Sequence, residues 1–346
     1  MQPHLFRVLS IDGGGIRGII PAMALAKIEE DTHKQIWELF DLIIGTSTGG
    51  ILALALTKPA DGDPNKAKYS ATDIVNMYVE NAATIFPCPP PPFQRSDLDF
   101  ILSARYPLSG IETVMQQYCG DTHLKDTLTE IVVVSYEFEL GQAFFFRSQD
   151  AKVSPQSSDW PIWEVAVATS AAPLYFPPMQ IEAPTTPKGY YALVDGGVAA
   201  NNPAMCGLAE AIRRFNQDSG NILVVSLGTG DLKELVVYDQ VQAGGLAQWG
   251  LTPLDMIFDG NSETVDFQVN SVLNQPGQEQ RYYRFQIPLT QDTSELDNSD
   301  PDNLARLQVL GSMLVEKIQG DLSQLYRQLQ PTSPRSGLLK EGDPGD

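Results

Sequence analysis

The sequence predicts an α/β fold, a three-layer sandwich in which helices cover both faces of a mostly parallel central sheet. Two short apolar segments, residues 5–11 and 42–45, each end in a glycine-rich turn, and a segment of helical periodicity follows each turn. Residues 221–230 repeat the apolar strand and the glycine turn. This alternation is typical of α/β layering, because parallel neighbours are usually connected through a crossover helix.

The first third of the chain contains the elements that frame these turns. Residues 19–28 carry apolar side chains at helical spacing, and Pro21 falls in the first turn, where proline is tolerated. A second helix is expected just after Ser47, and residues 71–86 also have a helical pattern. The proline-rich segment 87–93 is incompatible with regular structure, so we expect an extended surface connector or flap there.

The rest of the chain alternates strand and helix patterns. The expected strands are residues 130–138, 143–148, 190–197 and 282–289. The expected helices are residues 163–178, with a stop at Pro173, and residues 202–215. No repeat or composition shift marks a boundary, so residues 1–330 are interpreted as one domain with its core motifs in residues 5–230. Residues 331–346, rich in Pro, Gly and Ser, are expected to be a disordered tail.

Charge restricts the class of protein. The 346 residues include 23 basic and 43 acidic side chains, which give a net charge of −20. Such a field repels nucleic-acid phosphates and anionic membranes, so we expect neither nucleic-acid binding nor polybasic docking. No apolar run approaches the ~18 residues of a membrane span, and the first residues lack the pattern of a secretory signal.

Three widely spaced cysteines, Cys88, Cys119 and Cys206, form no CxxC pair. This arrangement is not typical of a disulfide framework or a cysteine-rich zinc site, and it favours a reducing compartment. We therefore expect a cytoplasmic protein. No spacing typical of a calcium loop or a zinc-ligand set occurs, so we expect neither a metal nor another cofactor.

The segment LIIGTSTGGILAL, residues 42–54, contains the first candidate for chemistry. Gly45, Ser47 and Gly49 match G-x-S-x-G between an expected strand and an expected helix, the context in which this motif exposes a nucleophile. The flanking glycines relieve crowding in the turn, and the first N–H groups of the helix favour an oxyanion nearby. The alternative is a plain glycine-rich turn in which Ser47 caps the helix.

An activated serine needs a group that accepts its proton. The three histidines, His4, His33 and His123, do not occupy the late position that the histidine of α/β-hydrolases has, and we expect surface roles for them. Asp195 is the best remaining candidate, because it ends an apolar strand and would face the rim where open α/β sheets form their clefts. Partial burial would make it a better base. The alternative is an ordinary Asp-Gly turn.

The turn DGGGIRG, residues 12–18, has the spacing G-x-G-x-x-G at Gly13, Gly15 and Gly18. A dinucleotide site requires an acidic residue at the end of the next strand, but that strand ends in glycine, threonine and serine at 45–47. The alternative use of the turn is an oxyanion hole, in which backbone N–H groups converge on a developing negative charge.

Three motifs in this order resemble the patatin-like phospholipases, a family of lipid acyl hydrolases: SIDGGGIRG, DLIIGTSTGG and LVDGGVAANNP. They lie within residues 8–203, and the strand ILVVSLGTG at 222–230 fits the same pattern. The resemblance implies a phospholipase A or lysophospholipase activity in which Ser47 is the nucleophile and Asp195 the proton acceptor. No histidine is required in this dyad.

The resemblance also implies roles for the neighbouring residues. The oxyanion donors would be the N–H groups of Gly13, Gly14, Gly15 and Thr48. Gly196 and Gly197 complete the DGG motif of the acid. Arg17 matches the basic position of the glycine loop, where it would either steer a lipid head group or form a structural ion pair. We expect Asp12, Asn201 and Asn202 to be turn and capping residues.

We expect the partner to be a lipid ester, and the net charge favours a neutral or zwitterionic one. Transient contact with a membrane or micelle surface is compatible with this expectation. The apolar segments 173–179 and 248–258 would line a substrate trough or belong to the ordinary core. Two alternatives remain open: an acyltransferase that uses the same dyad, and a non-catalytic lipid-binding protein.

Overall fold

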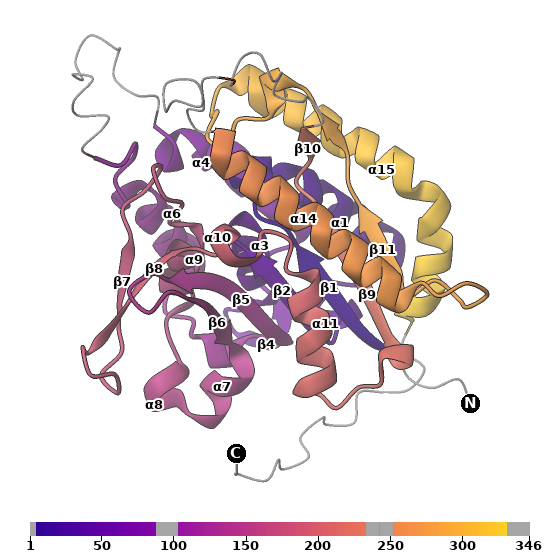
Figure 1. Ribbon diagram of the computed structural model, residues 1–346, viewed down its shortest axis with the longest axis horizontal. Coiled ribbons are helices and arrows are strands. Elements are labelled where there is room, and N and C mark those ends of the chain that lie inside the picture. The colour runs from indigo at the N-terminus through magenta and orange to yellow at the C-terminus, as the bar shows by residue number, and fades with distance from the viewer. Residues whose placement is uncertain (1–4, 88–102, 233–241, 243–251, 331–346) are drawn as a thin grey trace.

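Five neighbouring parallel strands form the larger part of the main sheet in the computed structural model (Figure 1), which describes residues 5–87, 103–232, 242 and 252–330. In spatial order they are β11 (Tyr282–Phe285), β9 (Ile222–Leu227), β1 (Phe6–Ile11), β2 (Leu42–Thr46) and β5 (Glu130–Glu137). The antiparallel strands of the same sheet are β6 (Gln142–Arg147), β8 (Tyr190–Asp195) and β7 (Met179–Glu182). The expected mostly parallel sheet is confirmed.

Side chains of the central strands alternate between two apolar clusters, because successive residues of a strand point to opposite faces. In β1, Phe6 and Val8 belong to one cluster, whereas Leu9 and Ile11 belong to the other. Every residue of β1 is buried, as expected for a parallel strand that is covered on both faces. The sheet is therefore the middle of three layers, which confirms the predicted sandwich.

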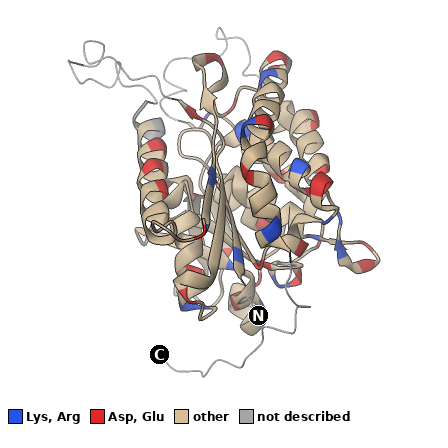
Figure 2. Ribbon diagram, turned by 90° about the vertical axis from the view of Figure 1, so that its right-hand side faces the viewer, with Lys and Arg blue, Asp and Glu red and all other residues tan. Residues whose placement is uncertain are grey.

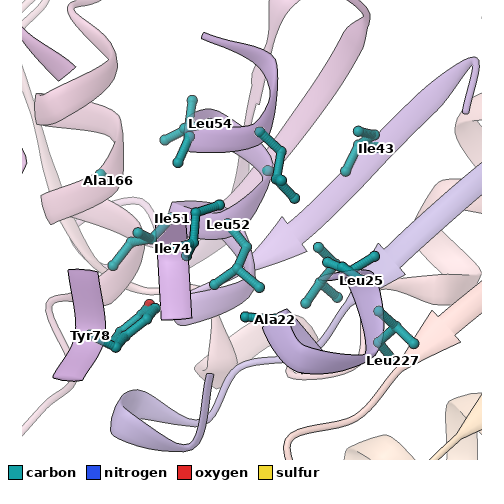
Figure 3. Packing of buried hydrophobic residues seen from close by; sticks show 14 of the residues in the cluster. Ala22, Leu25, Ile43, Ile51, Leu52, Leu54, Ile74, Tyr78, Ala166 and Leu227 are labelled. Atoms are coloured by element: carbon teal, nitrogen blue, oxygen red, sulfur yellow. The ribbon is translucent and has the colours of Figure 1, made fainter. Parts of the chain in front are cut away.

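The helices that pack into the larger cluster cover one face of the sheet. They are α1 (Ile19–Thr32), α3 (Thr48–Thr57), α4 (Ala71–Ile85), α6 (Ser109–Cys119), α9 (Ile162–Ser170) and α15 (Pro301–Leu329). Figure 3 shows Leu25 of α1, Leu52 of α3 and Ile74 of α4 gathered in this layer. Helix α15 lies along α1, and it begins with Asp300 as a side-chain cap and proline as its first residue.

The opposite face carries α10 (Gly197–Ala200), α11 (Ala204–Arg213) and α14 (Thr252–Leu273). The shorter elements are α2 (Ile36–Leu39), α7 (Ser148–Val153), α8 (Pro155–Ser158), β3 (Pro59–Ala60), β4 (Asp63–Ala67), β10 (Asp231–Leu232), β12 (Pro288–Leu289), and the 3-10 turns η1 (Gly15–Gly18), η2 (Leu124–Asp126), η3 (Ser219–Asn221) and η4 (Gln291–Thr293). Figure 2 shows the charged residues mainly on the outer helices and loops. None of the helices described here has the length and hydropathy to cross a bilayer.

Strands β2 and β8 lie end to end along one edge of β5. Strand β6 occupies the other edge, from Val132 to Glu137. On the edge that β2 and β8 share, β5 pairs with β2 up to Val134, which lies opposite Thr46. From Ser135 onward β5 pairs with β8, and Ser135 lies opposite Asp195. Strand β8 is antiparallel to β5, whereas the rim position expected for Asp195 assumed a parallel sheet, so that assumption is wrong for residues 190–197. Its C-terminal end nevertheless meets the C-terminal end of β2, because the two strands approach each other head-on.

Most of the expected elements occur near their predicted positions. The helix expected over residues 163–178 ends at Ser170, where the backbone leaves the helical region before Pro173 is reached. The strand expected over residues 282–289 is split into β11 and β12. The predictions for the proline-rich connector beyond Pro87 and for the tail at 331–346 fall outside the described residues.

Candidate active site

Ser47 occupies the sharp turn between β2 and α3, with φ +54° and ψ −124°. Such a conformation costs a residue other than glycine roughly 1–3 kcal/mol and persists where the surroundings hold it. The buried N–H of Ser47 donates to Thr169 Oγ1 at 2.8 Å. A Cβ atom at Gly49 would lie 2.1 Å from the carbonyl oxygen of Ile11, so glycine allows β1 to approach the turn. Gly45 stands against the backbone of Gly49 in the same turn.

Asp195 ends β8 directly opposite this turn. Ser47 Oγ donates a 2.6 Å hydrogen bond to Asp195 Oδ2, and the N–H of Gly197 donates to Asp195 Oδ1 at 2.7 Å. Ser47 is 7% exposed and Asp195 3% exposed. The structure therefore brings together the two residues that the sequence motifs indicate, and the DGG glycines form the turn that holds the carboxylate.

The end of α9 holds both turns. The hydroxyl of Thr169 accepts from the N–H of Ser47 and donates to the carbonyl of Val134, while its own carbonyl accepts from the N–H of Gly196 at 3.2 Å. The carbonyl of Ala171 accepts from the N–H of Asp195 at 3.0 Å. The pattern of residues 163–178 does not indicate this role of Thr169, because a threonine there is equally compatible with a plain helix end.

Burial sets the proton affinity of Asp195. Removal of the carboxylate from water raises its pKa from 3.8 to about 6, because the charged form loses hydration. The hydrogen bonds from Ser47 and from the N–H of Gly197 lower the pKa in opposition, because they favour the anion. The result is a carboxylate that is ionised at neutral pH and binds a proton more strongly than an exposed aspartate does.

The glycine turn after β1 presents N–H groups beside Ser47. Gly14 and Gly15 line the same pocket as Ser47 and Thr48, and among the described residues no acceptor is found for the N–H groups of Gly14, Gly15 or Thr48. The N–H of Gly13 differs, because it donates to the carbonyl of Asn201 at 3.0 Å. The expected donor role of Gly13 therefore does not fit this structure, since its N–H already has a partner.

The pocket beside Ser47 is mainly apolar and is partly open to the surface. Its apolar walls come from α3, α4, α6, α14 and the segments after α9 and before α15: Ile51, Tyr78, Ile85, Phe86, Ile111, Ala172, Tyr175, Phe176, Phe258 and Leu296. The hydroxyl of Tyr78 hydrogen-bonds with Thr48 Oγ1. Burial raises the pKa of Tyr78, so this phenol lines the pocket in its neutral form.

The two apolar segments expected to line a trough contribute in part. Tyr175 and Phe176 from residues 173–179 line the pocket, whereas Leu174 is 61% exposed. Phe258, from residues 248–258, lines it as well, but residues 248–251 lie outside the described part of the chain. The sequence did not predict that α4 and α6 contribute to the pocket. An amphipathic pattern shows that a helix has a buried face, but it does not show what that face contacts.

Arg17 and Asp12 lie on the other side of the glycine turn and border a second, polar cavity. Arg17 is 9% exposed, and it donates to the carbonyls of Gly14 and Ser294, each at 3.2 Å. These contacts favour a structural role for Arg17 over head-group steering. Asp12 forms a 2.6 Å ion pair with Arg284, a partner that its expected role as a turn residue did not include. Gly18 ends η1 beside Thr48 Oγ1.

The two asparagines have different partners. Asn202 precedes Pro203, the N-cap of α11, and its Oδ1 accepts from the N–H of Ala204, the first residue of that helix, at 3.0 Å. The backbone carbonyl of Asn201 accepts a hydrogen bond from the N–H of Gly13. Among the described histidines, His33 is an exposed C-cap of α1 and His123 contacts Asp159, and neither lines the Ser47 pocket. His4 lies outside the described residues.

Comparison with known proteins places this site in a family. The sequence model of the family described as patatin-like phospholipase matches residues 9–206, which contain the glycine turn, Ser47 and Asp195. Patatin-like protein 2 of Arabidopsis thaliana is 33% identical over 91% of this chain and 84% of its own length. Patatin-15 of Solanum tuberosum is 30% identical over 94% of this chain and 88% of its own length.

Among solved structures, the human GIVD cytosolic phospholipase A2 aligns with 94% of this chain and 60% of its own, at 10% identity and a TM-score of 0.46. The family model covers more than half of the chain, and the relatives cover about nine-tenths of it. The chain belongs to the patatin-like phospholipase family.

Proposed function

We propose that this protein is a lipid acyl hydrolase that cleaves the carboxylic ester of a phospholipid or lysophospholipid through Ser47 and Asp195. The observation that carries the proposal is the 2.6 Å hydrogen bond between Ser47 Oγ and Asp195 Oδ2 at an apolar pocket. Membership of a phospholipase family supports lipid hydrolysis as the activity. The N–H groups of Gly14, Gly15 and Thr48 would serve as the oxyanion hole.

In the first half-reaction, Ser47 Oγ attacks the ester carbonyl carbon while Asp195 Oδ2 accepts the hydroxyl proton. The carbonyl oxygen becomes an oxyanion that the free N–H groups hold, and each such donor typically stabilises the transition state by about 3 kcal/mol. The bond to the leaving oxygen then breaks, and Asp195 returns the proton to that oxygen. An alcohol or lysolipid leaves, and the acyl group remains on Ser47.

In the second half-reaction, Asp195 accepts a proton from water as the water oxygen attacks the acyl carbon. The oxyanion forms again at the same N–H groups and collapses with cleavage of the bond to Ser47 Oγ. Asp195 gives its proton to that oxygen, so the fatty acid leaves and the free enzyme is restored. A raised pKa suits Asp195 to this exchange, because the carboxylate must both take up and release a proton.

The apolar pocket and the charge of the chain support a class of substrate. Walls formed by isoleucine and aromatic side chains suit an acyl chain, whose burial contributes about 0.8 kcal/mol for each methylene group. The net charge of −20 favours a neutral or zwitterionic lipid over an anionic one. The proposed steps use this chain's side chains and backbone, and they call for neither a metal nor a cofactor.

Ser47→Ala is expected to abolish release of fatty acid from phosphatidylcholine in neutral mixed micelles, because no other group is proposed to form the acyl-enzyme. Ser271→Ala, which changes an exposed serine of α14, serves as the matched control and should keep full activity. Fatty acid release is measured by chromatography, and circular dichroism checks the fold of both variants. Release at the wild-type rate by Ser47→Ala would contradict the proposal.

The same assay with an added primary alcohol separates hydrolysis from acyl transfer. Hydrolysis yields free fatty acid, whereas an acyltransferase yields the fatty ester of the alcohol as its main product.

The value of kcat/KM for a short p-nitrophenyl ester should rise with pH through about 6 and then stay level. Asp195 acts as a base in its ionised form, and burial raises its pKa to about 6. Initial rates in buffers of constant ionic strength between pH 4.5 and 8 test this expectation. A profile that falls as the pH increases from 5 to 7 would rule out an aspartate base.

Asp195→Asn is expected to increase the free energy of unfolding at pH 8. The folded protein binds the Asp195 proton more tightly than the unfolded chain does, so wild-type stability decreases as the pH rises from 3.8 to about 6 and is level above. The rise in the pKa of Asp195 corresponds to about 3 kcal/mol. The free energy of unfolding of Asp195→Asn relative to the wild type should therefore increase by about this amount as the pH rises from 3.8 to about 6. Urea unfolding at pH 4 and pH 8 measures it.

Asp218→Asn makes the same chemical change at an exposed position and should show no such growth with pH. Equal stability of Asp195→Asn and wild type at both pH values would show that burial of this charge is not costly.

A further inference from the structure

Thr229 is a buried residue of the motif SLGTG that the proposed reaction does not use. It follows β9 and is 2% exposed. Its Oγ1 donates a 2.6 Å hydrogen bond to the carbonyl oxygen of Gly13. Thr229 borders the polar cavity behind the glycine turn and is not among the residues that line the Ser47 pocket.

This hydrogen bond determines the direction of the next N–H group. The structure has no cis peptide bonds among the residues described, and in a trans peptide the carbonyl and the following N–H point in opposite directions. Thr229 holds the carbonyl of Gly13 toward the polar cavity. The N–H of Gly14 is therefore directed the other way, toward the pocket that Gly14 shares with Ser47.

The neighbouring peptide is held in a similar manner. The carbonyl of Gly14 accepts from Arg17 Nε at 3.2 Å and from the N–H of Arg17 at 3.1 Å. Thr229 also packs closely against the glycine turn, because a Cβ atom at Gly14 would lie 2.2 Å from Thr229 Oγ1. The carbonyls of both glycines thus have donors on the side of the turn away from Ser47.

Without such a donor, the peptide between Gly13 and Gly14 has freedom to rotate, because neither residue has a side chain to restrict it. A rotated peptide places its carbonyl oxygen, rather than an N–H, beside the reacting ester. The oxyanion then loses one donor and faces a partial negative charge. The hydroxyl of Thr229 thus favours the orientation in which this peptide stabilises the transition state.

We propose that Thr229 is a positioning residue that orients the Gly13–Gly14 peptide so that the N–H of Gly14 faces the oxyanion. This inference rests on the proposed function. It concerns the transition state and not the binding of substrate, so the residue should affect kcat far more than KM.

The test compares Thr229→Val, which replaces the hydroxyl with a methyl group of similar size, with Thr229→Ser, which keeps the hydroxyl. Thr229→Val should lower kcat for a p-nitrophenyl ester by about 10²-fold with KM unchanged, as loss of an oxyanion donor does. Its Ki for a trifluoromethyl ketone, which forms an oxyanion with the serine, should rise by the same factor. Thr229→Ser should restore both values.

The matched control is Thr127→Val. Thr127 is 6% exposed and donates to the carbonyl of Leu124 at 3.0 Å, so this change removes a similar buried hydrogen bond elsewhere. It should lower the melting temperature as much as Thr229→Val does and leave kcat unchanged. In Thr229→Val the rise of activity near pH 6 should persist at a lower plateau, because Asp195 is untouched.

Wild-type kcat in Thr229→Val, or equal losses in Thr229→Ser and Thr229→Val, would overturn the positioning role. If valine prevents folding, Thr229→Ala makes the same comparison, because it removes the hydroxyl without placing a methyl group there. The proposed function fails separately, through retained hydrolysis in Ser47→Ala, and that result would overturn the positioning role as well.

Discussion

The site depends on one hydrogen bond, between Ser47 Oγ and Asp195 Oδ2, which has to form away from water. The sheet meets this requirement by bringing β2 and β8 head-on along the same edge of β5, so that the ends of the two strands lie one residue apart in register. Neither residue needs a long side chain or a flexible loop to reach the other. The backbone itself therefore aligns Ser47 with Asp195.

This arrangement has an energetic cost that other contacts offset. Ser47 adopts a conformation unfavourable to a residue with a side chain, and Asp195 retains a carboxylate that burial disfavours. The end of α9 compensates by providing acceptors for the N–H groups of Ser47 and Asp195. The strain and the buried charge are thus concentrated where the proposed reaction needs a reactive hydroxyl and a strong base.

Much of this architecture could be predicted from the sequence. Glycine-rich turns after apolar strands indicated the parallel sheet, and the motifs at Ser47 and Asp195 indicated their proximity. The direction of β8 could not be predicted, because it depends on the path of the preceding residues and not on the strand's own side chains. The partner of the Gly13 N–H and the role of Thr169 depend on backbone groups far apart in the sequence, which no local pattern reveals.

The proposed reaction requires the buried Asp195 to activate Ser47. Treatment with a fluorophosphonate probe, followed by mass spectrometric mapping of the modified peptide, tests it most directly. We expect a phosphonate adduct on Ser47 in the wild type and much slower formation in Asp195→Asn. An adduct on a different residue, or labelling of Ser47 in Asp195→Asn at the wild-type rate, would contradict it.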